Sequence, residues 1–169
     1  MADDLTLAYL AGVIDSDGYI SIVRSERKGA VYHGPQIGIS GTRRQPHDLA
    51  ASIWGGSVSL YHPKNPLHRG QFQWSRQGAV AATAIEAILP FLRIKEDQAL
   101  LALEVWENIE NGRWDDPFPW FGPSYDPIIV RDAMRQQMID INQSRNRVGK
   151  KAAGRLLDGR TWDQMPETP

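Results

Sequence analysis

Two carboxylates, Asp15 and Asp17, lie at the end of an apolar segment and are the first residues along the chain with an evident chemical use. Residues 4–17 are predicted to form a helix, and the Gly18 that follows is typical of a helix end. Both acids would then project from the exposed end of this helix, where carboxylates can bind hard divalent cations. The alternative is an ordinary amphipathic helix that ends in a solvated pair of aspartates.

Small residues recur on the same helix at intervals of four: Ala8, Gly12 and Ser16. This spacing places them along one face, which therefore carries almost no side-chain bulk. A glycine inside a helix costs about 1 kcal/mol relative to alanine, so Gly12 requires a compensating contact. We expect another backbone to pack closely against this face.

The rest of the chain alternates between strand-like and helix-like segments. Strands are predicted at 19–27, 31–40, 57–61 and 71–75, and helices at 49–54, 79–89, 95–110 and 127–142. Residues 62–70 and 112–127 are predicted to be loops. This order predicts an α+β fold in which helices cover one face of an antiparallel sheet. We expect a single domain over residues 1–143, with a basic C-terminal tail, 144–169, packed on it or near it.

Alternation along the predicted strands separates an apolar face from a polar face. The apolar residues expected in the core are Ile20, Ile22, Ile37, Ile39, Phe72 and Trp74. A sheet with a polar outer face can lie in the major groove of DNA, where Arg pairs with guanine and Gln with adenine. The alternative is an ordinary half-solvated sheet. The residues predicted to face DNA are Ser21, Val23, Ser25, Arg27, Gln36, Ser40, Ser57, Ser59, Tyr61, Gln71, Gln73 and Ser75.

The charges are segregated along the chain, although the net charge is only −1. Residues 24–76 hold eight Lys/Arg against two acids, residues 77–127 hold three against nine, and residues 128–160 hold eight against three. Two basic blocks around an acidic one indicate a surface that faces a polyanion and an opposite, solvated face. Basic tail residues are expected to contact phosphates without reading sequence: Arg145, Arg147, Lys150 and Lys151.

Composition excludes several other classes of protein. The 169 residues contain no cysteine, which excludes disulfides and thiolate metal sites and fits a reducing compartment. The N-terminus lacks a signal-peptide pattern, and no apolar run is long enough to span a membrane. We therefore expect an intracellular protein, in the cytoplasm or the host nucleoid. The tail 152–166 is similar to those of bacteriophage proteins.

Residues Leu10–Gly18, reading LAGVIDSDG, resemble the LAGLIDADG motif of homing endonucleases at seven of nine positions. Two later segments are similar to further family signatures: Ile39-Ser40-Gly41-Thr42 to the end of its second strand, and Leu89–Ala99 to its P-F-L-x-x-K-x-x-Q-A segment. The resemblance implies an αββαββα fold whose sheet saddles DNA. Because the chain has one motif, it also implies a homodimer that pairs through Ala8, Gly12 and Ser16, a row that is self-complementary about a two-fold axis.

The resemblance further implies a homing endonuclease that hydrolyses both strands of a long, pseudo-palindromic DNA target with Mg²⁺ or Mn²⁺. Asp17 would be the metal ligand, the Ser16 carbonyl a second ligand, and Lys95 the active-site lysine. Asp15 is expected to be structural. The family commonly has an amide side chain where this chain has Gly41, so we expect either that Gln45, Arg43 or Arg44 replaces it or that activity is weak.

Other interpretations remain open. A non-cleaving nucleic-acid binder, such as an intron RNA maturase or a DNA-binding regulator, would share the fold. No small-molecule cofactor and no membrane partner are expected. The four histidines have no metal-ligand spacing and are interpreted as loop residues or phosphate contacts: His33, His47, His62 and His68.

Overall fold

The computed structural model describes residues 2–63, 69–110 and 126–156, with side chains described as far as Ser144. The end of the tail, from residue 157, lies outside the described residues. So does the predicted loop 112–127, except for its last two residues. The elements in chain order are α1 (Asp4–Asp17), β1 (Gly18–Arg27), β2 (Ala30–Gly41), α2 (Gln45–Trp54), β3 (Ser59–Tyr61), β4 (Gln71–Gln77), α3 (Ala79–Ile88), the 3-10 turn η1 (Leu89–Phe91), α4 (Glu96–Glu110) and α5 (Pro127–Leu156).

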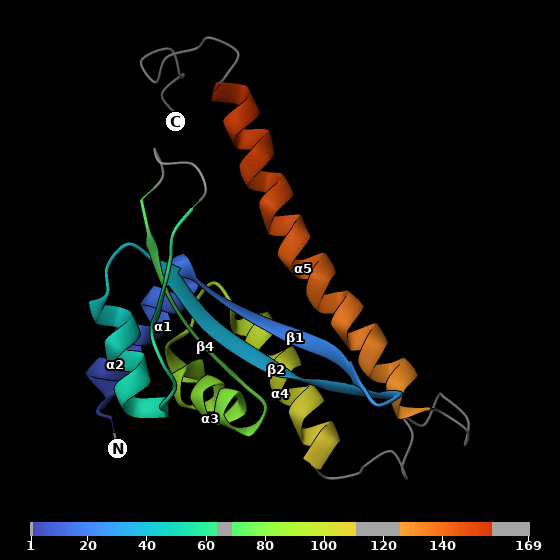
Figure 1. Cartoon of the computed structure of the whole chain (residues 1–169). Helices are drawn as coiled ribbons and strands as arrows, with labels where there is room; N and C mark the ends of the chain where they lie inside the picture. The colour runs from blue at the N-terminus through green and yellow to red at the C-terminus, as the bar shows by residue number, and fades with distance from the viewer. Residues whose placement is uncertain (1, 64–68, 111–125, 157–169) are drawn as a thin grey trace.

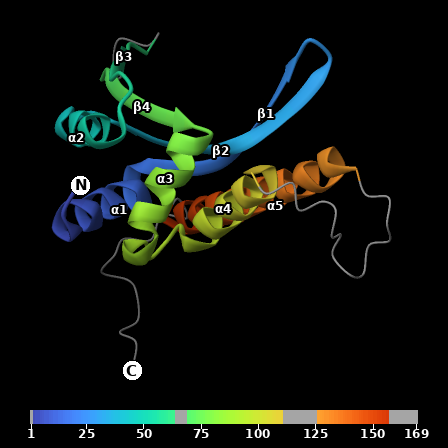
Figure 2. The same ribbon diagram turned by 90° about the horizontal axis from the view of Figure 1, so that it is seen from below.

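The strands form one antiparallel sheet in the order β1-β2-β4-β3. Figure 2 shows α1, α3, α4 and α5 on one side of this sheet, which we call the helix side. The opposite side, the free face, is not covered by any described element, and the two ends of the sheet curve toward it (Figure 2). The free face is therefore concave. The predicted α+β class and αββαββα order are confirmed.

Local chemistry explains where several elements begin and end. Asp3 caps α1, because its side chain accepts a hydrogen bond from the Thr6 amide at 2.8 Å. Lys28 and Gly29 join β1 to β2 with φ of 52° and 77°, the positive values that a two-residue type I′ hairpin turn requires. Gly55, with φ of 70°, ends α2.

The core lies between the sheet and the helix side. Ile20, Ile22, Ile37, Ile39 and Trp74 are all at most 4% exposed, as their alternation predicts. Helices α1, α3, α4 and α5 cover them with buried aliphatic residues, among them Leu10, Ile14, Ile85, Val105 and Met138. The predicted Phe72 is only partly buried, because it lies near the open end of the sheet.

Four element boundaries differ from the prediction by two residues or more. Helix α2 begins at Gln45 rather than at residue 49, and β4 continues to Gln77 rather than ending at residue 75. Strand β3 begins at Ser59 rather than at residue 57, so Ser57 precedes it. Helix α5 continues to Leu156 instead of ending near residue 142, and the predicted boundary between domain and tail falls inside it (Figure 1). Gly149 and Gly154 lie inside α5, since each glycine costs a helix only about 1 kcal/mol and the Arg, Lys and Ala residues around them favour a helix.

Candidate active site and nucleic-acid interface

The end of α1 meets the start of α4 at Asp15. Its Oδ2 accepts hydrogen bonds from the backbone amides of Arg93 at 2.8 Å and Ile94 at 3.1 Å, and its Oδ1 accepts one from Lys95 at 2.9 Å. Three successive amides thus converge on one carboxylate, as in an anion-binding nest. The expectation that Asp15 is structural agrees with these contacts.

Lys95 reaches back to the same helix end. Its Nζ donates hydrogen bonds to the backbone carbonyls of Ile14 at 2.8 Å and Asp15 at 2.5 Å. These carbonyls belong to the last turn of α1, where intrahelical donors run out and the helix dipole favours a cation. The start of a helix is an unfavourable place for a lysine, but here the ammonium lies at the end of another helix.

Asp17 and Ser16 lie at the exposed end of α1, beside this contact. The Ser16 hydroxyl donates to the Val13 carbonyl at 3.2 Å. The Ser16 carbonyl belongs to the last turn of α1, where carbonyls lack intrahelical donors. Among the described residues, no group of three His, Cys, Asp or Glu side chains could hold a metal ion. One exposed carboxylate still suits Mg²⁺, which typically binds one or two carboxylates and takes its remaining ligands from water and phosphate.

The segment after β2 carries the residues predicted to compensate for Gly41. A Cβ atom at Gly41 would lie 3.7 Å from Cε1 of His47, an ordinary contact, so packing does not require glycine here. Arg43 and Gln45 are both exposed. Arg43 lies in the turn that leads into α2, and Gln45 is the first residue of α2. Arg44 instead pairs with Asp48 at 3.1 Å and lies 5.9 Å above the Phe72 ring, which occupies its side chain.

The strand register places the predicted DNA-reading residues on the free face, except Ser57, which precedes β3 and has no place in the register. Rows run across the strands: Ser21 pairs with Gln36, and Ser40 pairs with Gln73, which pairs in turn with Ser59. Two thirds of this set is exposed to solvent and the rest is partly buried. The exposed members are Ser25, Arg27, Ser57, Ser59, Tyr61, Gln71, Gln73 and Ser75, and the partly buried ones are Ser21, Val23, Gln36 and Ser40.

Tyr19 is a free-face residue that the sequence prediction missed. It is 36% exposed and pairs across the strands with Gly38. A Cβ atom at Gly38 would come within 2.6 Å of Cζ and Oη of Tyr19, so the ring occupies the space above this glycine. Alternation with Ser21 could have identified Tyr19. Gln77 was missed because the strand continues two residues past its predicted end.

One face of α1 is open to solvent in the single chain. Leu5 is 84% exposed and Tyr9 51% exposed, and Gly12 and Ser16 are also exposed, whereas Ala8 is partly buried. Apart from its two chain neighbours and the nearby backbone of α1 itself, no described atom lies within 4 Å of a Cβ built at Gly12. The backbone contact expected for the small residues is therefore not made within the described part of this chain.

Two histidines have roles other than the predicted ones. The His33 side chain is fully buried and donates from Nε2 to Asp132 of α5 at 2.8 Å, and Arg24 donates to the same carboxylate at 3.1 Å. The hydrogen bond from His33 is the main cause that holds the pKa of Asp132 below its usual 3.8. His47 is 1% exposed and donates from Nδ1 to the Arg43 carbonyl at 2.9 Å. Neither side chain is available to a phosphate.

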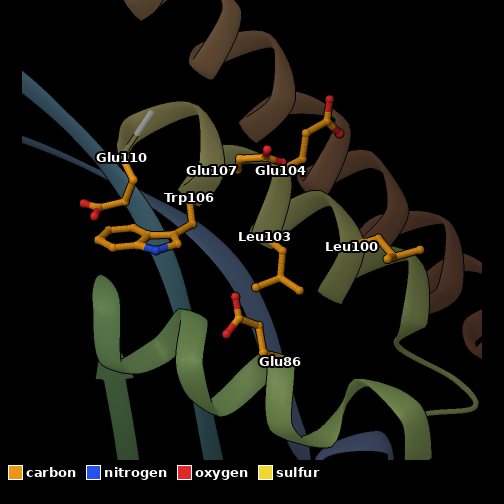
Figure 3. Close-up of a pocket in the computed structure, with 7 residues that line it drawn as sticks. All are labelled: Glu86, Leu100, Leu103, Glu104, Trp106, Glu107 and Glu110. Carbon is orange, nitrogen blue, oxygen red and sulfur yellow. The ribbon is translucent and has the colours of Figure 1, made fainter. Parts of the chain in front are cut away.

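A pocket of about 460 Å³ lies between α3 and α4, on the helix side (Figure 3). Glu86 of α3 faces six residues of α4, of which three are acids, Glu104, Glu107 and Glu110. Burial and the neighbouring Glu107 raise the pKa of Glu104 above its usual 4.5. The negative charge disfavours a phosphate backbone here.

The basic tail residues Arg145, Arg147, Lys150 and Lys151 lie on the C-terminal half of α5. Their side chains are outside the described set, so their phosphate contacts stay a prediction. Among the described residues no helix is both long enough and apolar enough to cross a membrane.

Comparison with known proteins places the fold. No family model matches the chain, and no curated protein does so. The structure matches that of the homing endonuclease I-CvuI in complex with its target, with a TM-score of 0.59 and 18% identity over 81% of this chain and 82% of that one. It also matches the homing endonuclease I-TnaI (TM-score 0.55, 13% identity, 84% and 99% covered) and the archaeal intron-encoded homing endonuclease I-Vdi141I complexed with DNA (0.53, 14%, 81% and 98%). The protein has the homing-endonuclease fold, as its LAGLIDADG-like motif predicts.

Proposed function

We propose that this protein is a site-specific endonuclease that binds double-stranded DNA as a homodimer and hydrolyses both strands. The observation that carries the proposal is the position of Asp17 and Lys95. Both lie where α1 leads into β1, at the edge of a concave, polar sheet face. The two residues that we propose for catalysis would therefore lie next to the side chains that we propose to read bases.

The free face supports DNA as the partner. Apart from Val23, the predicted DNA-reading residues on it are Ser, Gln, Arg and Tyr, which can donate to and accept from base edges in a major groove. Four glutamates gather instead in the α3–α4 pocket on the helix side. This separation would orient a polyanion toward the free face.

The exposed face of α1 supports the homodimer. Leu5 and Tyr9 expose apolar surface beside Gly12, whose Cβ position is empty. A second copy of α1 packed there would bury this surface and bring the two Asp17 carboxylates together about a two-fold axis. Two carboxylates at close range repel each other unless cations lie between them, which favours a divalent metal at this point.

The site residues fit Mg²⁺ or Mn²⁺. Asp17 and the Ser16 carbonyl would hold the cation, which when bound activates water and stabilises charge on the departing phosphodiester oxygen. The Lys95 ammonium is held beside the same helix end and would stabilise negative charge that develops there. Arg43 and Gln45 would orient solvent and phosphate in place of the amide absent at Gly41.

One observation favours the second candidate, a nucleic-acid binder that does not cleave. Gly41 has room for a side chain but provides none, so solvent near Asp17 lacks one common orienting group. An intron RNA maturase or a DNA-binding regulator would retain the free face without needing that group.

The proposal is tested by incubating the purified protein and Mg²⁺ with a plasmid library that carries a randomised insert, and by sequencing the cut ends. We expect cut ends that share one long, pseudo-palindromic sequence. A sequence that is retained by the protein but never cut would favour the non-cleaving binder. Absence of both cutting and binding would reject the proposal.

A further inference from the structure

Asp15 and Lys95 bind each other's backbone at the junction of α1 and α4. The Asp15 carboxylate holds the amides of residues 93–95, and the Lys95 ammonium holds the carbonyls of residues 14 and 15. Together these contacts close a ring of hydrogen bonds between two segments that lie about 80 residues apart in sequence. Each charged group therefore restrains the other.

The charges in this ring also match the helix ends. The carboxylate lies beside the start of α4 and the ammonium beside the end of α1, which are the positions that the helix dipoles favour. Hydrogen bonds to charged groups are stronger than ordinary ones. They can therefore offset the rotamer entropy that a lysine side chain loses when it is held in one place.

We infer that Asp15 is a positioning residue for DNA cleavage. It fixes the backbone of Lys95 and so holds the Lys95 ammonium against the Ile14 and Asp15 carbonyls, close to Asp17 in the chain. This inference rests on the proposed endonuclease function. Asp15 would then affect the rate of DNA cleavage through Lys95. A purely structural cap would affect only the stability of the fold.

A double-mutant cycle tests the inference. Single-turnover cleavage of a duplex recovered from the random library is measured for the wild type, Asp15→Asn, Lys95→Met and the double variant. We expect Asp15→Asn to slow cleavage roughly ten- to a hundredfold, the usual effect of removing a group that orients a reacting one, with DNA affinity nearly unchanged. On the Lys95→Met background, the same change should alter the rate less than about twofold.

The chain provides a matched control. Asp3 caps α1 with one hydrogen bond to Thr6 and lies at the other end of that helix, so Asp3→Asn should leave the cleavage rate unchanged. Thermal unfolding monitors the fold of every variant. If Asp15→Asn does not fold, Asp15→Glu, which keeps the charge but displaces the carboxylate, takes its place in the cycle.

Two outcomes overturn the inference while the proposed function stands: wild-type cleavage rates in Asp15→Asn, or an effect that multiplies fully with that of Lys95→Met. A wild-type protein that cuts no library sequence overturns the proposed function and the inference together. Loss of stability with unchanged cleavage by the folded fraction would leave Asp15 as a structural cap and so also reject the inference.

Discussion

The two ends of the β1–β2 hairpin are held by different kinds of interaction. Where β1 begins, Asp15 and Lys95 hold the end of α1 through hydrogen bonds to backbone groups. Near the turn, Arg24 and His33 hold Asp132 of α5 through side chains, and Asp132 remains 41% exposed. Backbone contacts fix one geometry, whereas side-chain contacts leave the neighbouring positions free to carry different residues.

The difference matches the two tasks that we assign to these ends. A group that reacts must be held within a fraction of an ångström, which backbone contacts and helix ends can do. Side chains that read DNA need exposure and variety instead. The comparison predicts that changes near α1 affect cleavage strongly and that changes toward the turn affect sequence preference or stability more weakly.

The largest effect is expected from Asp17→Asn. Loss of the carboxylate that we propose as the metal ligand should abolish cleavage, because the cation would have no charged protein ligand, while DNA affinity stays within about tenfold. Cleavage assays and gel-shift titrations of the same preparation measure both. Cleavage that persists in this variant would remove Asp17 from the site.

Gly12→Leu should separate the two copies. The side chain projects where, apart from its chain neighbours and the nearby backbone of α1, no described atom of the same chain lies within 4 Å, and leucine is a better helix former than glycine by about 1 kcal/mol. The monomer should therefore remain folded while the dimer is lost. Light scattering gives the mass, and Thr83→Leu, an exposed position on α3, is the matched control. A normal dimer mass for Gly12→Leu would place the interface elsewhere.

Gln73→Ala and Arg27→Ala should each relax preference at a symmetric pair of base positions. A bidentate contact to one base discriminates by about 1–3 kcal/mol, so selected sites should become degenerate at those positions only. Cut-site sequencing of the variants checks this, with Gln137→Ala on α5, an exposed glutamine of the helix side, as control. Unaltered site profiles would argue against base reading by the free face.

Replacing Lys150 and Lys151 with alanine should weaken binding to all sequences alike. Phosphate contacts release counterions, so the slope of log affinity against log salt should flatten by about one to two units per chain. Binding isotherms at several salt concentrations measure this slope. A change in which sequences are cut would mean that the tail, rather than the sheet, reads bases.

The smallest effect is expected from Asp132→Asn, which should lower the free energy of unfolding by less than about 1 kcal/mol because the pair is partly exposed. The pKa of Asp132 is lowered by the His33 hydrogen bond and by Arg24. The stabilisation should therefore be complete above the ordinary pKa of 3.8 and be lost as the pH falls through the lowered folded-state value. Denaturant unfolding of both proteins between pH 2 and 7 checks this, and a difference that grows on acidification would contradict it.

Local pattern predicted most of the fold. The alternation of Ile20 and Ile22 and the helix end at Gly18 each carry their signal within a few residues. The end of α5 was placed too early, because Gly149 and Gly154 lower the stability of the helix too little to end it.

The contacts that hold the site could not be predicted in the same way. The carboxylate of Asp15 is bound by residues 93–95, and His33 is buried by Asp132, at sequence separations of 78 to 99 residues. No periodicity reports such a pairing. Lys95 was identified only through its resemblance to a family signature, and its ammonium position required the fold.

The central claim, that two copies cut DNA about a shared two-fold axis, is tested most directly by mapping the cut on each strand of a selected target. The account predicts an inverted-repeat target with one cut per strand, placed symmetrically about its centre. A target without inverted symmetry, or a cut confined to one strand, would contradict it.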